Sequence, residues 1–310
     1  MSETAIYDLV ILGGGPAGMT AAIYAARANL DTLLLEENIT GGLVNSTYMV
    51  ENFPSWPAIH GIKLMDKMRE HVDNCDVRVE EVCEIKELRL QGPVKTVIGE
   101  DGEYKARAAI LATGRRPVPL PMETKAPEQV HHCAICDGAP YVGKHVLVVG
   151  GGNSAFDESL YLLALGVARI TLVEVMNRYS AVQSTQDALF FSGKAQGRLQ
   201  TRVHDLLTEN GRLKAAVLEN GTTGERETYP VDGIFVFLGQ TPNNALFRNQ
   251  VALTEDGYIK AAADMSTNIP GVFGAGDIND KRYRQITTAM ADGTIAALSA
   301  EHWLRTRQRT

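Results

Sequence analysis

Short apolar runs alternate with helix-forming stretches from the beginning of the chain. The run 7–12 contains β-branched residues and leads into glycines, a pattern typical of a buried parallel strand. Residues 19–28 are rich in alanine and other strong helix formers, which predicts a helix. Residues 32–36 predict a second strand. The three segments together predict a strand–helix–strand unit.

The same order of segments returns in the middle of the chain. A strand at 145–149 precedes a second glycine turn, a helix at 156–165 and a further strand at 170–174. Such an internal repeat predicts two related nucleotide-binding units. Two more apolar runs, 108–114 and 233–239, each lead towards a proline, and each predicts a late strand that closes its own domain.

The C-terminal segment has no glycine turn of its own and ends in a long helical pattern at 287–304. We therefore expect it to return to the first domain and complete it. This gives an α/β protein with an inserted domain: residues 1–116 and 245–310 form the first domain, residues 117–244 form the second, and the proline-rich stretch 117–127 is a linker.

Composition narrows the functional classes. The chain has 310 residues, 45% of them hydrophobic and 22% charged, with a formal net charge of -7. A mildly acidic protein is a poor candidate for nucleic-acid binding. No apolar run approaches the about 18 residues that span a membrane. Residues 1–7 show no targeting pattern, so we expect a cytoplasmic protein that binds neither nucleic acid nor membrane.

The first glycine turn carries the pattern G-x-G-x-x-G. Gly13 makes the tight turn, Gly15 lets the backbone approach a pyrophosphate, and Gly18 lets helix and strand pack closely. The helix N-terminus behind the turn offers free N–H groups to an anion. Glu36, at the end of the second strand, can accept hydrogen bonds from an adenosine ribose. The turn therefore predicts a dinucleotide site.

The second turn carries the pattern G-x-G-x-x-A, at Gly150, Gly152 and Ala155. The same physical argument predicts a second nucleotide site, with less force. Paired domains sometimes keep this architecture and lose the ligand, so an empty second domain remains an alternative.

Four cysteines are present, and two of them form C-x-x-C at Cys133 and Cys136. Two thiols at this spacing close a small disulfide ring, and Asp137 beside them can handle the proton of dithiol chemistry. The alternative is a zinc site, which needs four ligands, with His131 and His132 as the nearby candidates. We expect no metal and no catalytic role for the other two cysteines, Cys75 and Cys83.

At this point the chain resembles the low-molecular-weight thioredoxin reductases of bacteria over essentially its whole length. The motifs that carry the resemblance are 13–18, 50–54, 112–114, 133–138, 150–155, 274–277 and 282–285. The resemblance implies two Rossmann-like, three-layer domains, with FAD in the first and a pyridine nucleotide in the second. It also implies a homodimer, thioredoxin or a thioredoxin-like protein as partner, and a disulfide that moves between flavin and partner by domain rotation.

The resemblance also assigns roles to residues. Cys136 would lie nearer the flavin, Cys133 would attack the partner's disulfide, and Asp137 would be the acid. Gln285 and Ile286 would face the flavin ring from the N-terminus of the last helix, where the helix dipole would stabilise the reduced, anionic flavin. The residues expected to bind FAD are Gly13, Gly15, Pro16, Ala17, Gly18, Glu36, Gly42, Asn52, Val82, Thr113, Gly114, Gly276, Asp277, Gln285 and Ile286.

Three departures from the family pattern concern the electron donor. Members that use NADPH usually carry His-Arg-Arg after the second strand of the nucleotide domain, where this chain has Glu174-Val175-Met176 and only Arg178 nearby. A carboxylate there suits a free ribose 2′-hydroxyl and repels a 2′-phosphate. Residues 41–43 read Gly-Gly-Leu where Gly-Gly-Gln is usual, and Trp303 lies near the C-terminus. Trp303 either stacks on the flavin or packs on the core or on a dimer partner.

The sequence thus predicts a flavoprotein disulfide oxidoreductase that uses FAD, the Cys133–Cys136 pair and thioredoxin or a similar small protein. Glu174 argues against NADPH and leaves NADH or reduced ferredoxin as donor. The alternative of another class is an FAD-bound thiol redox sensor or binding protein without turnover. Asp137 argues against that alternative, because a switch without turnover needs no proton-transfer residue.

Overall fold

The computed structural model describes residues 6–100, 102–122 and 126–307, and the chain divides into two compact units. The first unit is Met1–Arg116 with Thr241–Thr310, and the second is Pro117–Gln240. The second boundary falls after Gln240, where the sequence had placed it after residue 244. The reason is local: β7 (Arg115–Pro117) and β16 (Gln240–Pro242) form a two-stranded sheet where the chain passes between units. Residues 1–5, part of the stretch judged for targeting, and linker residues 123–125 lie outside the described residues.

The sheet of the first unit has seven strands among the described residues, in the order β3-β2-β1-β6-β5-β4, with β17 also paired to β6. β5 runs antiparallel to both of its neighbours, β4 and β6, and the other pairs are parallel. β6 is long enough to pair with β5 along its first half and with β17 along its second. The bounds are β1 Ile6–Leu12, β2 Thr32–Leu35, β3 Arg78–Glu80, β4 Ile85–Arg89, β5 Lys95–Gly99, β6 Glu103–Leu111 and β17 Val272–Gly274.

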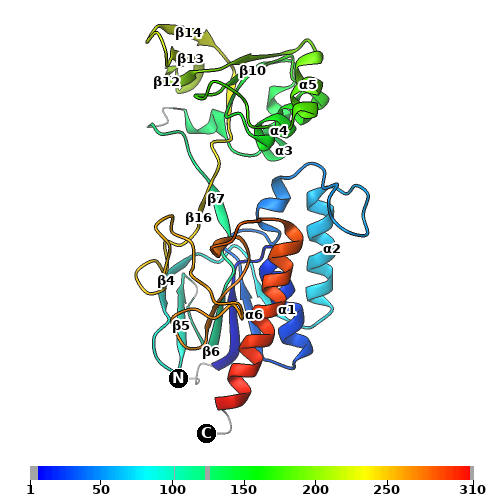
Figure 1. Cartoon of the computed structure of the whole chain (residues 1–310), viewed down its shortest axis with the longest axis vertical. Helices are drawn as coiled ribbons and strands as arrows, with labels where there is room; N and C mark the ends of the chain where they lie inside the picture. The colour runs from blue at the N-terminus through cyan, green and yellow to red at the C-terminus, as the bar shows by residue number, and fades with distance from the viewer. Residues whose placement is uncertain (1–5, 101, 123–125, 308–310) are drawn as a thin grey trace. The chain divides into compact units, whose positions relative to one another are not determined.

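Helices cover one face of this sheet (Figure 1). They are α1 (Pro16–Arg27), α2 (Gly61–Asp73) and α6 (Ile286–Arg307), with the short 3₁₀ helices η1 (Gly42–Ser46) and η4 (Gly276–Ile278) in the loops. Because side chains alternate along a strand, Leu9 and Ile11 pack under the helices, whereas Val10 and Leu12 face a second core on the other side of the sheet. The buried Lys95 donates to the carbonyls of Gly92 and Pro270.

The second unit repeats this layering. Its five-stranded sheet is parallel throughout, in the order β11-β10-β9-β15-β8. Helices pack on one face, and a three-stranded antiparallel sheet packs on the other. The strands are β8 Val130–His131, β9 His145–Val149, β10 Arg169–Val173, β11 Ala195–Arg198, β12 Thr201–Glu209, β13 Arg212–Asn220, β14 Arg226–Pro230 and β15 Gly233–Val236. The helices are α3 Ala134–Asp137, α4 Asn153–Leu165 and α5 Gln183–Phe191, with 3₁₀ turns η2 Pro127–Gln129 and η3 Ala139–Tyr141.

The two predicted strand–helix–strand units are present as β1–α1–β2 and β9–α4–β10. In each, the first strand lies between its following strand and a late strand of the same unit, β6 or β15. This confirms the predicted α/β class with two Rossmann-like units. Within the described residues, no helix has the length and apolar character needed to cross a membrane.

Candidate functional site

The first glycine turn leaves open space in front of α1. Gly13 has a φ of +106°, and a Cβ there would lie 2.4 Å from the carbonyl oxygen of Ala112. A Cβ on Gly18 would lie 1.8 Å from the Gly13 oxygen, so the turn closes tightly on itself. A Cβ on Gly15 would meet no atom within 4 Å, and no side chain caps the helix that begins at Pro16. The free N–H groups at this helix end are therefore open to an anion.

Glu36 sits beside this turn with both carboxylate oxygens engaged. One accepts the Gly14 N–H at 2.6 Å, and the other accepts the Asn38 N–H at 2.9 Å. Val82 extends the same corner: it has a φ of +56°, its N–H donates to the Asn38 carbonyl at 3.0 Å, and its side chain is 74% exposed. The carboxylate is thus fixed at the place where an adenosine ribose would lie, and its remaining lone pairs are available to hydroxyl groups.

Asp277, in η4, holds a buried acceptor that the protein does not satisfy. Its Oδ1 is buried and has no hydrogen-bond partner, while Arg115 lies 3.5 Å from Oδ2. Burial raises the pKa of Asp277, and the Arg115 charge opposes this. The preceding Gly276, with a φ of +81°, packs so that a Cβ would lie 2.8 Å from that of Ala17. A buried polar atom without a partner is costly unless a ligand or water satisfies it.

The loops that contain Gly42 and Gly114, both predicted to bind FAD, lie near the first glycine turn. Gly42 has a φ of +58°, and its Cβ would stand 3.4 Å from the Gly15 Cα. Gly114 has a φ of +61° and open space around it. The hydroxyl of Thr113, however, donates to the carbonyl of Asn243 at 2.7 Å, so this side chain fixes its loop to the returning segment.

The structure brings Asn52 and Gln285 together from 233 positions apart: the Asn52 amide donates to the Gln285 side-chain oxygen at 3.1 Å. Gln285 precedes Ile286, the first residue of α6. Trp303 lies 17 residues further, about 25 Å along the helix at 1.5 Å per residue. Its ring packs against Gly271 and the helix-side core. This contact corresponds to the packing role considered for Trp303, and its stacking on a flavin stays a prediction.

FAD fits the first unit on these observations. The open helix end suits its pyrophosphate, the fixed Glu36 suits its ribose, and the unsatisfied oxygen of Asp277 suits a ribityl hydroxyl. The glycines at 13, 15 and 18 give the close backbone approach that a dinucleotide needs.

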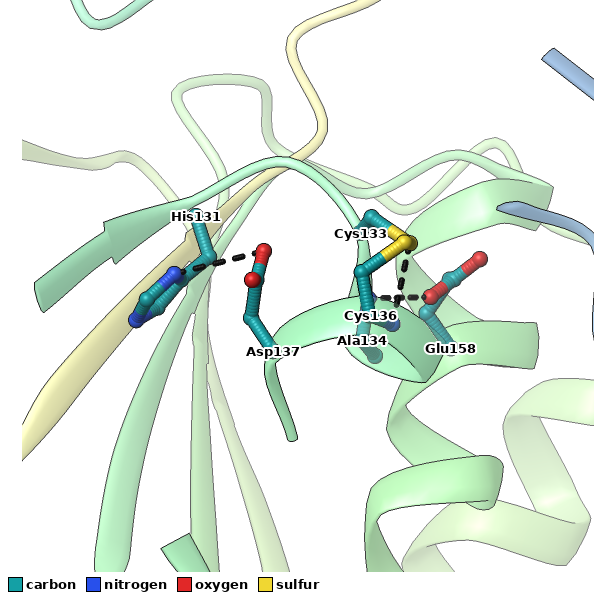
Figure 2. Close-up of a disulfide and its surroundings, with 6 residues drawn as sticks. All are labelled: His131, Cys133, Ala134, Cys136, Asp137 and Glu158. Atoms are coloured by element: carbon teal, nitrogen blue, oxygen red, sulfur yellow. Dashed lines mark hydrogen bonds and ion pairs between the residues drawn. A yellow bond between two sulfur atoms is a disulfide. The ribbon is translucent and has the colours of Figure 1, made fainter. Parts of the chain in front are cut away.

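Cys133 and Cys136 are joined as a disulfide in the second unit, with Cα atoms 5.4 Å apart (Figure 2). Cys133 is the N-cap of α3, and its sulfur accepts the Cys136 N–H at 3.1 Å. Cys136 is exposed and Cys133 is half-buried. A backbone N–H directed at a sulfur stabilises that sulfur as a thiolate once the disulfide is opened.

Asp137 ends α3 and faces His131 at the end of β8. The His131 Nδ1 lies 3.3 Å from the Asp137 carboxylate, and its Nε2 lies 2.7 Å from the hydroxyl of Tyr141. Burial lowers the pKa of His131, although Asp137 opposes this. Burial also raises the pKa of Tyr141 to about 12. His131 is therefore a neutral imidazole that lies between the phenol of Tyr141 and the carboxylate of Asp137.

Glu158 lies below the disulfide turn, on α4. Its Oε2 accepts the Ala134 N–H, at the first residue of α3, at 2.8 Å (Figure 2). Burial raises the pKa of Glu158 to about 7, partly opposed by this hydrogen bond. Glu158 is a site residue that the sequence motifs did not predict. The available signal was its position, because α4 buries its neighbours Ala155 and Ser159.

The second glycine turn is built like the first. Gly150 has a φ of +126°, and its Cβ would meet the Phe237 carbonyl oxygen at 2.3 Å. A Cβ on Gly152 would meet only a Ser180 hydroxyl at 3.7 Å, and Ala155 is fully buried. The N-terminus of α4 therefore has open space in front of it, without a side-chain cap.

Glu174 occupies in the second unit the place that Glu36 has in the first. Its Oε1 accepts the Met176 N–H at 2.9 Å, two residues on, as Glu36 accepts from Asn38. Its Oε2 would lie 2.6 Å from a Cβ on Gly151. A carboxylate held against the glycine turn presents negative charge where a nucleotide ribose would bind.

The candidate zinc ligands are engaged elsewhere. His131 bridges Asp137 and Tyr141, and His132 Nδ1 contacts the Val236 carbonyl at 3.3 Å. Among the described residues, no three His, Cys, Asp or Glu side chains gather as metal ligands. Cys83 is buried in the core on the face of the first sheet opposite the helices, and Cys75 packs beside the core under the helices.

Comparison with known proteins agrees with this architecture. The model of the pyridine nucleotide-disulphide oxidoreductase family matches residues 7–293. The chain is 41% identical over 307 residues to a Clostridium pasteurianum protein described as a 34.2 kDa protein in rubredoxin operon, covering 98% of this chain and 99% of that protein. It is 39% identical over 313 residues to thioredoxin reductase of Bacillus subtilis, covering 100% and 98%. The crystal structure of Lactococcus lactis thioredoxin reductase superposes with a TM-score of 0.89 at 35% identity, covering 97% and 99%.

Proposed function

We propose that this chain, which belongs to the pyridine nucleotide-disulphide oxidoreductase family and resembles its thioredoxin reductases, passes electrons from FAD to the Cys133–Cys136 disulfide and on to thioredoxin or a similar small protein. By this kinship the chain is a flavoprotein oxidoreductase. The observation that carries the proposal is the disulfide itself, presented at a surface turn beside Asp137. Bound in the first unit, FAD would supply the electron pair that opens this disulfide.

The contacts around the disulfide support a different role for each of its two cysteines. The Cys136 N–H, directed at the Cys133 sulfur, favours a thiolate there, and that thiolate would attack the partner's disulfide. Cys136 would then displace the partner by closing the original disulfide. Asp137 would move the proton between Cys136 and the partner's leaving sulfur.

For the donor, we propose NADH or a reduced ferredoxin and not NADPH. Glu174 is fixed by the Met176 N–H, so it cannot swing away from a 2′-phosphate without losing that hydrogen bond. The same carboxylate would accept hydrogen bonds from the free ribose hydroxyls of NADH. The Clostridium pasteurianum relative is named for its place in a rubredoxin operon, which supports testing a protein donor as well.

The cysteine roles are tested by serine variants. Cys136→Ser should lose thioredoxin reduction but capture, through Cys133, a thioredoxin whose single cysteine is activated with thionitrobenzoate. Cys133→Ser should lose both activities. Thioredoxin reduction that survives Cys136→Ser would refute the scheme, and thiol formation that stops after one equivalent would support a redox switch instead.

The donor is tested by anaerobic titration with NADPH, NADH and reduced ferredoxin in turn, following flavin bleaching. We expect NADH or ferredoxin to bleach the flavin well before NADPH does. The variant Glu174→Arg should recover NADPH bleaching if NADH is the donor, because an arginine binds the 2′-phosphate. Faster bleaching of the unaltered protein by NADPH than by either alternative would overturn the donor proposal. The expected homodimer is a further prediction, which sedimentation would measure.

A further inference from the structure

We propose that His131 is a positioning residue for Asp137: its Nδ1–H holds the carboxyl that handles the proton of dithiol exchange, and Tyr141 holds His131 in the required tautomer. The inference rests on the proposed function, because it assumes that the Cys133–Cys136 pair undergoes exchange. It concerns a residue that the sequence suggested only as a zinc ligand.

The three groups form a line of contacts from Tyr141 through His131 to Asp137, the residue that follows Cys136 of the disulfide. Tyr141 Oη lies 2.7 Å from His131 Nε2, and His131 Nδ1 lies 3.3 Å from Asp137 Oδ2. In Figure 2 the Asp137 carboxyl lies between His131 and the disulfide. His131 comes from β8 and Asp137 from the last residue of α3, so the contact ties the disulfide turn to the central sheet.

The His131 ring has little freedom to leave this arrangement. It packs against Tyr141, at a centroid distance of 5.3 Å, and against Phe235, at 5.1 Å, and these two rings also contact each other. Tyr141 and Phe235 are both buried. The His131 side chain is 14% exposed, whereas the Asp137 side chain is 40% exposed and therefore open to an incoming partner.

The two hydrogen-bonding neighbours of His131 allow only one tautomer of its ring. Burial keeps Tyr141 a phenol and His131 a neutral imidazole at neutral pH. An ionised carboxylate only accepts hydrogen bonds, so Nδ1 carries the hydrogen and donates to Asp137. Nε2 is then the acceptor and takes the Tyr141 O–H. The other charged or titratable groups facing this line are His132, Lys144 over the Tyr141 ring, and Asp232.

The proton balance shows where this contact acts. The Cys133 thiolate attacks one sulfur of the partner's disulfide, so that S–S bond breaks and a mixed disulfide forms. Asp137 takes the proton of the Cys136 thiol and passes it to the partner's leaving sulfur. The Cys136 thiolate then attacks the Cys133 sulfur, which restores the Cys133–Cys136 disulfide and releases the partner as a dithiol. The second proton is the one that Cys133 lost on becoming a thiolate. His131 keeps its own hydrogen throughout and orients the carboxyl.

The test follows disulfide reduction by dithiothreitol in the intact protein across pH 5.5 to 9, using quenched alkylation. This readout needs neither thioredoxin nor an electron donor, so it can fail while the proposed function holds. His131→Leu should slow the reaction roughly tenfold, part of what general acid–base catalysis contributes, and change its pH profile as Asp137→Asn does. His131→Asn, whose amide N–H replaces Nδ1–H, should recover most of the rate. His131→Gln, whose amide replaces Nε2, should not. His132→Leu is the matched control.

A double-mutant cycle separates positioning from simple packing. If His131 acts through Asp137, His131→Leu should have no further effect on the rate when Asp137 is already Asn. Circular dichroism of each variant reports whether the second unit is folded. An unchanged pH profile in folded His131→Leu would overturn the proposal, as would the same rate loss in the Asp137→Asn background.

Discussion

The substitution Glu158→Gln should remove a pH dependence from the stability of the protein. Burial below the disulfide turn raises the pKa of Glu158 from 4.5 to about 7. Between these two values the folded protein keeps a proton that the unfolded chain releases. Stability therefore falls as pH rises from 4.5 through 7, and it levels off above 7. Glutamine preserves an oxygen for the Ala134 N–H but cannot ionise.

The size of the stability difference follows from the pKa shift of Glu158. About 2.5 units at 1.36 kcal/mol per unit give about 3 kcal/mol as an upper value. As pH rises from 5 to 8, the unfolding free energy of Glu158→Gln should thus increase by up to about 3 kcal/mol relative to that of the unaltered protein. Most of this change should occur below pH 7. Partial solvent access to the carboxyl reduces this figure.

Urea unfolding of the oxidised protein at half-unit pH steps measures the difference, because titrations common to both proteins cancel. Glu209→Gln, at a surface carboxylate paired with Lys214, reports the cost of the same substitution in solvent. The stability of Glu209→Gln should stay within about 0.5 kcal/mol of that of the unaltered protein. A difference between Glu158→Gln and the unaltered protein that stays constant from pH 5 to pH 8 would show that the buried-carboxyl argument is wrong.

Three other substitutions test the first unit. Gly18→Ala, whose Cβ would lie 1.8 Å from the Gly13 oxygen, should destabilise the protein by about 3 kcal/mol and lower its flavin content, measured by thermal unfolding and absorbance. Asp277→Asn should weaken FAD binding about 10- to 100-fold in fluorescence titrations, since a hydrogen bond to a charged group is lost; unchanged affinity would exclude Asp277 as a ligand. Lys95→Ala should cost about 2–4 kcal/mol in urea unfolding, because it leaves a cavity and two unpaired carbonyls, one of them that of Pro270; a loss below about 0.5 kcal/mol would contradict this.

Local patterns were enough to predict the two repeats and their turns. The glycines at 13 and 150 stand where a side chain would collide with a carbonyl oxygen, and this requirement is visible in the sequence as G-x-G. The continuous burial of the apolar residues of β1 and β9, whose side chains alternate between the two cores of each unit, follows from the same short apolar runs.

Contacts between distant segments could not be predicted from such patterns. The line from Tyr141 through His131 to Asp137 depends on how β8 pairs with β15, and no spacing rule encodes that pairing. Glu158 lay on a predicted helix, but its burial depends on α3 packing above it. The division after Gln240, four residues before the predicted boundary, lies at the pairing of β7 with β16, which joins residues more than a hundred positions apart.

This pairing of β7 with β16 also makes the second unit modular. The Val118 N–H donates to the Gly239 carbonyl at 3.0 Å, so the inserted segment enters and leaves at one point. A gene encoding residues 118–239 alone would specify a chain whose two ends already meet. Replacing the same segment by a short turn would close the first unit with little added loop entropy. The unit that carries the Cys133–Cys136 disulfide could thus be exchanged between relatives as a single segment.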